Sequence, residues 1–189
     1  MVWGGTYEGV WPDDSWIDTP TPIKIHGLEN VKQVACGLNH ILALKVDGTV
    51  LTWGKNDNGQ LGDGTNEDKL NPVQISDLVN IKFIAAGDYH SFAIQKNGAV
   101  WAWGINSSCQ LGDGSNKAKN IPVQIPNFSN VKMIAATFDH NIALKEDGSV
   151  WAWGENRNGQ LGNGSSEFSK IPILIPGTLY LIIDKNQII

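Results

Sequence analysis

The residues best suited to chemistry in this chain are three histidines at equal spacing. His40, His90 and His140 lie 50 residues apart. An imidazole titrates near neutral pH and binds metals, so such a pattern is compatible with a general base or a metal site. The regular spacing argues against both. A reaction centre needs different groups that converge at one point, whereas a residue that recurs once per repeat lies at the same place in every repeat. We therefore expect these histidines to make structural hydrogen bonds.

Acidic and amide side chains form a second group of candidates, in this case for calcium. Asp13, Asp14 and Asp18 lie close together, and residues 56–58 and Asp63 are all Asn or Asp. Their spacing does not supply the alternating oxygen ligands of a calcium loop, so turns are the favoured interpretation. The sequence also lacks a phosphate-binding glycine loop, a nucleophile elbow and an HExxH motif. We expect a protein that is not an enzyme and that carries no cofactor or metal.

The histidine spacing extends to the whole chain, which is an array of 50-residue units. Roughly half the positions are identical between residues 72–121 and 122–171. The sequence divides into units 22–71, 72–121 and 122–171, with partial units at 1–21 and 172–189. Besides the histidines, we assign structural roles to the repeated tryptophans and to the glycines of a repeated loop: Trp53, Trp103, Trp153, Gly59, Gly62 and Gly64.

Each unit predicts four short antiparallel strands. The stretch 81–125 shows the pattern: an apolar run that ends in small residues, an alternating run from His90, a third run from residue 100, and a fourth strand that begins at Pro122. Asn97-Gly98 between the second and third runs predicts a type I′ hairpin. Proline is tolerated at the start of an edge strand. Four such strands per unit predict an all-β fold of propeller blades.

These repeats resemble those of the regulator of chromosome condensation (RCC1-type) repeat family. In that family a blade contains an apolar residue, two small residues, Gly, two variable positions, His and then alternating apolar residues, and segments 34–44 and 84–94 fit throughout. The third copy departs at Thr137 and Asn141. The Trp-Gly-x-Asn-x-x-Gly-Gln-Leu-Gly-x-Gly loop is also a family feature, with Cys109 in place of a glycine in the second copy. The resemblance covers almost the whole chain and implies a β-propeller.

The number of units is smaller than the resemblance implies. Family members usually form a seven-bladed ring, which at this step needs on the order of 350 residues. The 189 residues here provide about three full blades plus part-blades, and therefore an incomplete ring. Three interpretations stay open: a fragment of a longer chain whose remainder completes the ring, a homo-oligomer in which chains complete each other, and a small ring closed by its own ends.

Large apolar residues on variable loops are the best candidates for a binding face. The loop between the first and second strands carries Leu38, Tyr89 and Phe138 in successive units. Aromatic residues on loops above a rigid ring bury a large area at low entropic cost, as protein recognition requires. The first unit's long loop is also rich in aromatic residues, and there the alternative is that they only plug the start of the array. Its candidates are Tyr7, Trp11 and Trp16.

Composition narrows the classes of partner. The chain has 14 Lys and Arg against 19 Asp and Glu, for a net charge of −5. This balance argues against a nucleic-acid partner, because phosphate binding concentrates basic residues. No apolar stretch is long enough to span a membrane, and the N-terminus does not resemble a secretory signal. With only two cysteines, neither in a CxxC motif, we expect a reducing compartment such as the cytoplasm, although the sequence does not establish localisation.

We therefore expect a non-enzymatic protein-protein interaction module that binds an unidentified protein through its loop faces. The alternative, which the family resemblance implies, is a guanine-nucleotide exchange factor for a small GTPase. In the resembling family, exchange requires a complete ring and a protruding wedge. The uniform 50-residue step leaves no insertion to form such a wedge.

Overall fold

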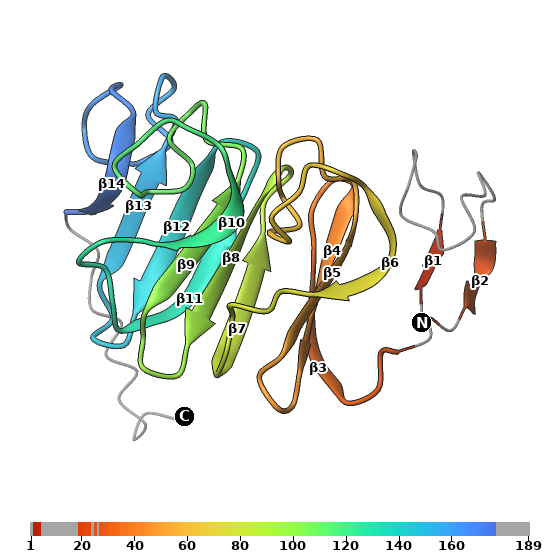
Figure 1. Ribbon diagram of the computed structural model, residues 1–189. Helices are drawn as coiled ribbons and strands as arrows, with labels where there is room; N and C mark the ends of the chain where they lie inside the picture. Colours follow the sequence, from red (N-terminus) through yellow and green to blue (C-terminus); the bar gives the residue numbers. More distant parts are fainter. Residues whose placement is uncertain (1, 5–18, 24, 26, 177–189) are drawn as a thin grey trace, which may run out of the picture.

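The computed structural model of the chain describes residues 2–4, 19–23, 25 and 27–176. Within these residues every regular element is a β-strand and there is no helix. Figure 1 shows the strands standing side by side, with loops at both ends of each sheet. The short apolar runs and the glycines between them thus fold as the repeat pattern predicts.

Three antiparallel sheets of four strands each make up the described molecule, and we name them blades 1, 2 and 3. Within a blade the strands pair in chain order, so the first is an inner strand and the fourth an outer edge strand. Blade 1 contains β3 (Val31–Cys36), β4 (His40–Lys45), β5 (Val50–Gly54) and β6 (Lys69–Gln74). Blade 2 contains β7 (Ile81–Ala86), β8 (His90–Gln95), β9 (Val100–Gly104) and β10 (Lys119–Gln124), and blade 3 contains β11 (Val131–Ala136), β12 (His140–Lys145), β13 (Val150–Gly154) and β14 (Ser169–Leu174).

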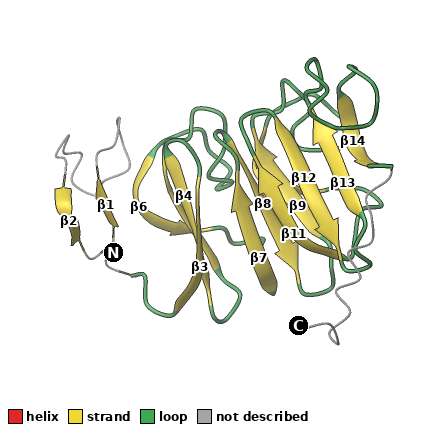
Figure 2. Cartoon of the chain, turned by 180° about the vertical axis from the view of Figure 1, so that it is seen from behind, coloured by secondary structure: helices red, strands yellow, loops and turns green. Residues whose placement is uncertain are grey.

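The blades follow one another in an arc whose inner strands are neighbours. β7 of blade 2 contacts β3 of blade 1 on one side and β11 of blade 3 on the other. The same order is visible from behind in Figure 2. The sheets do not close on themselves, so the fold is an incomplete, all-β propeller.

A two-stranded sheet precedes blade 1 along the chain. β1 (Val2–Gly4) pairs antiparallel with β2 (Thr19–Ile23), with Val2 opposite Ile23 and Gly4 opposite Thr19. Fifty residues later, Gly54 lies opposite Lys69 in β5 and β6. These two strands therefore correspond to the third and fourth strands of a blade.

The hairpin between the second and third strands differs from the predicted type I′ turn. That turn needs positive φ at two successive residues. Here Gly48 has a φ of 91°, whereas neither Val46 nor Asp47 has a positive φ. The amide of Lys45 bonds to the carbonyl of Thr49 across a three-residue loop. The β-branched Val46 keeps the common right-handed backbone, and the glycine alone takes the left-handed one.

The fourth strand begins before the proline, not at it as predicted. β6 starts at Lys69, three residues ahead of Pro72, and its pairing with β5 shifts between Thr52 and Gly54. The proline lies in this irregular stretch of an edge strand, where a missing N–H breaks no ladder. The same arrangement recurs in β10 and β14.

The hydrophobic core lies between the blades. One cluster joins the facing sides of blades 1 and 2, and it includes Leu42 and Leu44 of blade 1 with Trp103 of blade 2. A second joins blades 2 and 3 and includes Phe92 of blade 2 and Trp153 of blade 3. All these side chains are essentially without solvent exposure. A blade therefore gains its stability by stacking on its neighbours.

Candidate protein-binding site

The repeated histidines lie at the seams between blades. His40 begins β4, and its Nε2 lies 2.9 Å from the hydroxyl of Ser91 in blade 2. His90 begins β8, and its Nε2 lies 2.7 Å from the side-chain oxygen of Asn141 in blade 3. Both rings are buried. Each is therefore positioned to link its own blade to the next.

Burial also fixes the charge state of these rings. It lowers the pKa of His40 to about 3, helped by the nearby His90. It lowers the pKa of His90 to about 4, although the hydrogen bond to Asn141 opposes the shift. Both histidines are consequently neutral near pH 7. Residues 27–176 contain no group of three or more His, Cys, Asp and Glu side chains that could hold a metal ion.

The seam bond continues to a main-chain carbonyl and a tryptophan. The Ser91 hydroxyl donates to the carbonyl of Gln60 at 2.9 Å, and the Trp103 indole N–H donates to the same oxygen at 2.9 Å. Because the single hydroxyl proton of Ser91 is used here, its oxygen accepts from Nε2–H of His40. We call this set of four residues the seam network.

The second seam repeats this network with a different side chain. The Asn141 amide donates to the carbonyl of Gln110 at 2.8 Å, and the Trp153 indole donates to it at 2.7 Å. The Asn141 oxygen accepts from Nε2–H of His90. Ser91 and Asn141 were not among the residues singled out from the sequence for a role. Their signal is a polar residue in an otherwise buried strand, because such a group needs a partner.

Repeated glycines make room for the seam. A Cβ at Gly62, whose φ is 71°, would lie 2.7 Å from the indole nitrogen of Trp103. A Cβ at Gly59 would lie 2.6 Å from the Cα of Asn120 in blade 2. Gly64 exchanges two bonds with Asn120: its N–H donates to the Asn120 carbonyl, and its carbonyl accepts from the Asn120 amide. Gly59 and Gly62 thus allow the long loop of blade 1 to approach blade 2 closely, whereas a Cβ at Gly64 would meet only the Ile121 side chain, at 3.8 Å.

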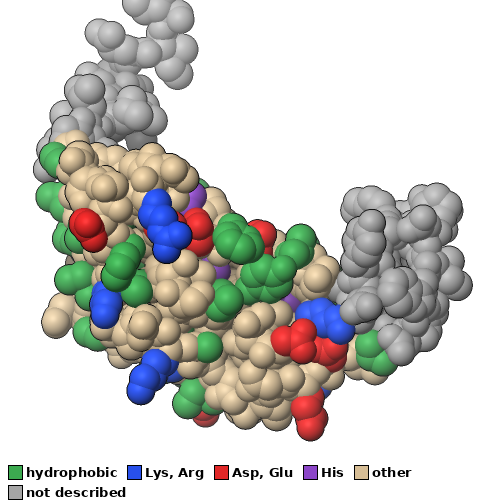
Figure 3. Space-filling model, turned by 90° about the horizontal axis from the view of Figure 1, so that it is seen from above, with side chains coloured by type: hydrophobic (Ala, Val, Ile, Leu, Met, Phe, Trp, Pro, Cys, Tyr) green, Lys and Arg blue, Asp and Glu red, His purple; other side chains and the backbone are tan. Residues whose placement is uncertain are grey.

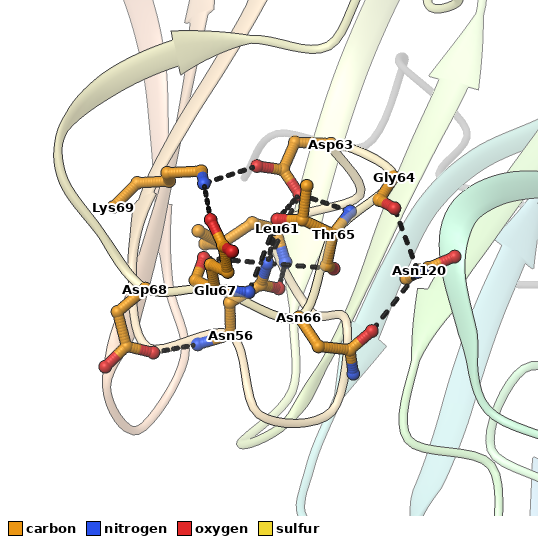
Figure 4. Close-up of polar contacts among 10 residues, drawn as sticks. All are labelled: Asn56, Leu61, Asp63, Gly64, Thr65, Asn66, Glu67, Asp68, Lys69 and Asn120. Carbon is orange, nitrogen blue, oxygen red and sulfur yellow. Dashed lines mark hydrogen bonds and ion pairs between the residues drawn. The ribbon is translucent and has the colours of Figure 1, made fainter.

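The long loop itself is held by a buried asparagine (Figure 4). The Asn56 amide donates to the carbonyls of Thr65 and Glu67 at 3.0 and 3.1 Å, and its oxygen accepts from the N–H of Leu61. Asp63 accepts from Thr65. Burial would raise the pKa of Asp63, but bonds from Thr65 and the nearby lysine charge lower it overall. The loop's acidic and amide groups therefore bond to one another, and Asn106 and Asn156 repeat the pattern.

The exposed apolar candidates lie on the loops that follow the inner strands. Leu38 is 55% exposed and Phe138 is 58% exposed, while Tyr89 between them is half-buried. Tyr89 and Phe138 form an edge-to-face pair with ring centroids 6.0 Å apart. We call Leu38, Tyr89 and Phe138 the loop patch. Tyr7, Trp11 and Trp16 lie outside the described residues.

Main-chain bonds tie the three loops into one row. The N–H of Leu38 donates to the carbonyl of Asp88 at 3.1 Å, and the N–H of Asp88 donates to the carbonyl of Thr137 at 3.2 Å. Figure 3 looks onto this face, where hydrophobic side chains gather with acidic side chains near them. The loop patch is therefore a surface built on a fixed backbone.

The third histidine has a different environment from the other two. His140 is half-buried, and its Nδ1 lies 2.9 Å from the hydroxyl of Thr137 and 3.1 Å from Asp139. At the equivalent positions, a Cβ on Gly37 or Gly87 would overlap the ring of its own histidine. Thr137, which the sequence marked as a departure, is thus accommodated because the His140 ring is placed differently.

The fold and the site define a class: a propeller-type array of four-stranded blades, joined by polar seams and carrying an exposed loop patch. Residues 1–183 match the RCC1-like domain family, and the chain belongs to that family. No curated protein matches the sequence. Within the described residues, no helix is long and apolar enough to cross a membrane.

Solved structures with this fold include Prp20p from Saccharomyces cerevisiae, described with its binding properties to Gsp1p and histones. The chain is 29% identical to it with a TM-score of 0.71, over 80% of this chain and 40% of that one. Human WBSCR16 is 26% identical with a TM-score of 0.76, over 89% and 46% of the two chains. Yeast RCC1 (Prp20) bound to Kap60 is 24% identical, with a TM-score of 0.79 over 93% and 44%. The chain therefore spans less than half the length of the matched chain in each of these three structures.

Proposed function

We propose that this chain is a non-enzymatic protein-protein interaction module that binds its partner through the loop patch. The observation that carries the proposal is the position of Leu38, Tyr89 and Phe138. All three occupy the same loop of successive blades, two are more than half exposed, and main-chain bonds connect their loops. Exposed apolar groups on a fixed backbone bind with little loss of entropy.

The chemistry of the patch fits a protein surface with apolar and basic side chains. Tyr89 and Phe138 offer aromatic faces, and Asp88 and Asp139 are their sequence neighbours. Residues 27–176 contain no ion-pair partner for Asp88, and within them the Asp139 carboxylate pairs only with the His140 ring. Carboxylates beside aromatic rings favour Lys or Arg side chains of a partner.

The opposite end of the blades is a weaker candidate for the protein-binding surface. Its large exposed apolar side chains include Val46 in a hairpin and Val79 in a connection between blades. These are aliphatic residues at different places of the repeat, and isolated exposed apolar residues are normal on protein surfaces. The loop patch, by contrast, places an aromatic pair on a loop that recurs in each blade.

The likeness to known structures supports a protein partner in general terms. Prp20p is described with its binding properties to Gsp1p and histones, and the same yeast protein is bound to Kap60 in a second structure, so this relative binds proteins. These partners belong to that protein, of which this chain spans 40% and 44% in the two structures.

Site-specific photo-cross-linking tests the proposal. A photoreactive phenylalanine analogue is placed at Leu38 or Phe138, and in matched control variants at Val46 or Val79. We expect a defined protein adduct from the two loop-patch positions and none from the controls, with the same unfolding midpoint in all four variants. Equal adducts from both ends of the blades would contradict the proposal.

A guanine-nucleotide exchange activity is the second candidate, favoured by the 29% identity to Prp20p. Its test is nucleotide release from a panel of small GTPases in the presence of substoichiometric amounts of the chain. Acceleration that is lost in Asp88→Ala or Tyr89→Ala would assign the activity to the loop patch. Unchanged release rates would leave the binding module as the function.

A further inference from the structure

Each inner strand carries a lysine at its second position, where the strand is irregular. The pairing of the first two strands shifts between residues 31 and 33 in blade 1 and between residues 81 and 83 in blade 2. Lys32 and Lys82 are therefore the extra residues of β-bulges, which re-aim a side chain. In blade 2 the lysine reaches across the seam, where its Nζ lies 3.2 Å from the carboxylate of Glu146 in the hairpin of blade 3.

The hairpins that face these lysines are held in the same way in both seams. The N–H of Lys96, in the hairpin of blade 2, donates to the carbonyl of Asn80 at 2.9 Å. The N–H of Glu146 donates to the carbonyl of Asn130 at the same distance. Each hairpin is thus tied to the segment that leads into its own blade.

The contact between successive blades at this end also repeats. A Cβ on Gly48 would lie 3.2 Å from the amide nitrogen of Ile81, and a Cβ on Gly98 would lie 2.9 Å from that of Asn130. The separation of 64 residues between the two members of the ion pair is also that between Lys32 and Lys96. Lys96 therefore faces Lys32 across the first seam as Glu146 faces Lys82 across the second.

The first seam consequently has two ammonium groups where the second has an ion pair. Both Lys32 and Lys96 are exposed, and neither takes part in an ion pair within residues 27–176. The carboxylate of Asp47, in the hairpin of blade 1, accepts from the N–H of Thr49. Like charges at one place repel, and an anion between them replaces the repulsion with two attractions.

We propose that Lys32 and Lys96 form a binding site for a phosphate group at the hairpin end of the seam between blades 1 and 2. A phosphate dianion has the charge and the number of acceptor oxygens to contact both ammonium groups, whereas one carboxylate neutralises only one of them. The phosphate is either the free ion or a phosphorylated side chain of another protein. Lys32 lies near the start of β3, and Leu38 of the loop patch follows its end, so this site is independent of the loop patch.

Titration of the chain, with its lysine side chains isotope-labelled, by inorganic phosphate tests the site. The NMR signals of the lysine side chains are followed at constant ionic strength and at pH 7.5. We expect the signals of Lys32 and Lys96 to shift together and to saturate at millimolar phosphate, while that of Lys82 stays in place because Glu146 already pairs with it. Equal, unsaturated shifts of all lysines would mean an adventitious ion only, and would overturn the proposal.

Variants of the two hairpins give matched controls. Lys32→Gln and Lys96→Gln should each weaken phosphate binding at least about five-fold, as the loss of one exposed ion pair does. Lys96→Glu should abolish binding, because it places in the first seam the ion pair of the second. Conversely, Glu146→Lys should create a second phosphate site with Lys82. All four changes are on exposed side chains, so the midpoint of urea unfolding should stay the same. Unaltered binding in Lys96→Glu, or no second site in Glu146→Lys, would contradict the proposal.

Two further ligands identify the chemistry of the anion. A short phosphoserine peptide that shifts the same two lysines more strongly than inorganic phosphate would assign the site to a phosphorylated side chain. Binding of inorganic phosphate without binding of the peptide would assign it to the free ion. Succinate, a dicarboxylate, should bind more weakly than phosphate. Succinate binding as tight as that of phosphate would overturn the assignment to a phosphate group.

Discussion

Blades 2 and 3 share a strand sequence but not an environment. Val100–Gly104 and Val150–Gly154 both read Val-Trp-Ala-Trp-Gly, and they pair with their neighbours in equivalent register. Yet Phe92 is fully buried while Ile142 at the same repeat position is 42% exposed. The difference follows from stacking: blade 2 has blade 3 on its outward side, whereas the outward side of blade 3 has no described blade against it.

The histidines of the two blades also differ, in their burial and in their hydrogen bonds. His90 is buried and bonded across a seam, whereas within the described residues the His140 ring bonds only to Thr137 and Asp139 of its own loop. The contrast teaches that the repeat sequence determines the shape of a blade, while the neighbouring blade determines how far its side chains are buried. Paired changes in the two blades can test this conclusion.

The largest difference is expected from truncation of the outward apolar residue. Phe92→Ala should lower the free energy of unfolding by about 4 kcal/mol, because it leaves a cavity between blades 2 and 3. Ile142→Ala should lower it by less than about 1 kcal/mol, because a side chain that is already exposed leaves no cavity. Urea unfolding of both variants measures the two values. Similar losses would mean that the side of blade 3 around Ile142 is covered in solution.

The second-largest effect is expected from acid, which should weaken the seams between the blades. The pKa of His40 is lowered to about 3 and that of His90 to about 4, so the unfolded chain binds more protons than the folded chain below about pH 6.5. Stability should therefore fall as the pH drops from 6.5 to 4.5, by roughly 2 kcal/mol for each histidine. Urea unfolding at several pH values measures this slope.

The control for the acid effect is the double variant His40→Gln, His90→Gln. Glutamine keeps an N–H donor but does not titrate, so the slope between pH 6.5 and 4.5 should flatten. The lowered pKa of Asp63 acts at lower pH, where protonation of its carboxylate removes stability, and so lies outside this window. An unchanged slope in the double variant would assign the acid effect to other groups.

The loop glycine should give a smaller contrast between the same blades. Gly87→Ala forces a Cβ against the His90 ring and the carbonyl of Thr137, and we expect a loss of about 2 kcal/mol from overpacking. Thr137→Ala, at the equivalent place in blade 3, should cost less than about 1 kcal/mol, since the hydroxyl that bonds to His140 there is exposed and water can replace it. The midpoints of thermal unfolding measure the two losses. Equal shifts of the midpoint would contradict the different placement of the two histidine rings.

The smallest effects are expected from exchanging the seam side chains. Ser91→Ala should cost about 1 kcal/mol, because the Nε2–H of His40 loses its acceptor. Ser91→Asn should cost less, since Asn141 makes the same bonds in the next seam. Denaturant midpoints distinguish the three proteins. A larger loss for Asn than for Ala would show that the two seams are not interchangeable.

Much of the fold is predictable from the sequence because the repeat gives the strand pattern three times. The order of strands, the all-β class and the incomplete ring are confirmed. Two local details were wrong. The Asn-Gly and Asp-Gly pairs predict a type I′ turn, but a third loop residue changes the geometry. The sequence predicts that the fourth strand begins at proline, whereas the strand begins earlier because an edge strand admits proline within an irregular stretch.

The candidate site was predictable only in part. Exposed residues on a repeated loop can be recognised from the sequence, as Leu38 and Phe138 show. The seam acceptors could not be recognised, because the carbonyls of Gln60 and Gln110 belong to the main chain and carry no side-chain signal. Whether the loop patch binds a partner stays a prediction for the cross-linking experiment.

The seam network has a consequence for how such an array grows. His40 and Ser91 are 51 residues apart, as are His90 and Asn141, and each tryptophan is 43 residues from its carbonyl acceptor. Duplication of any whole 50-residue unit preserves all these separations. A copied unit therefore contains both the donors and the acceptors that form the hydrogen bonds between blades. An insertion of another length inside a strand or seam loop misaligns them. Lengthening by gene duplication therefore requires no new interface.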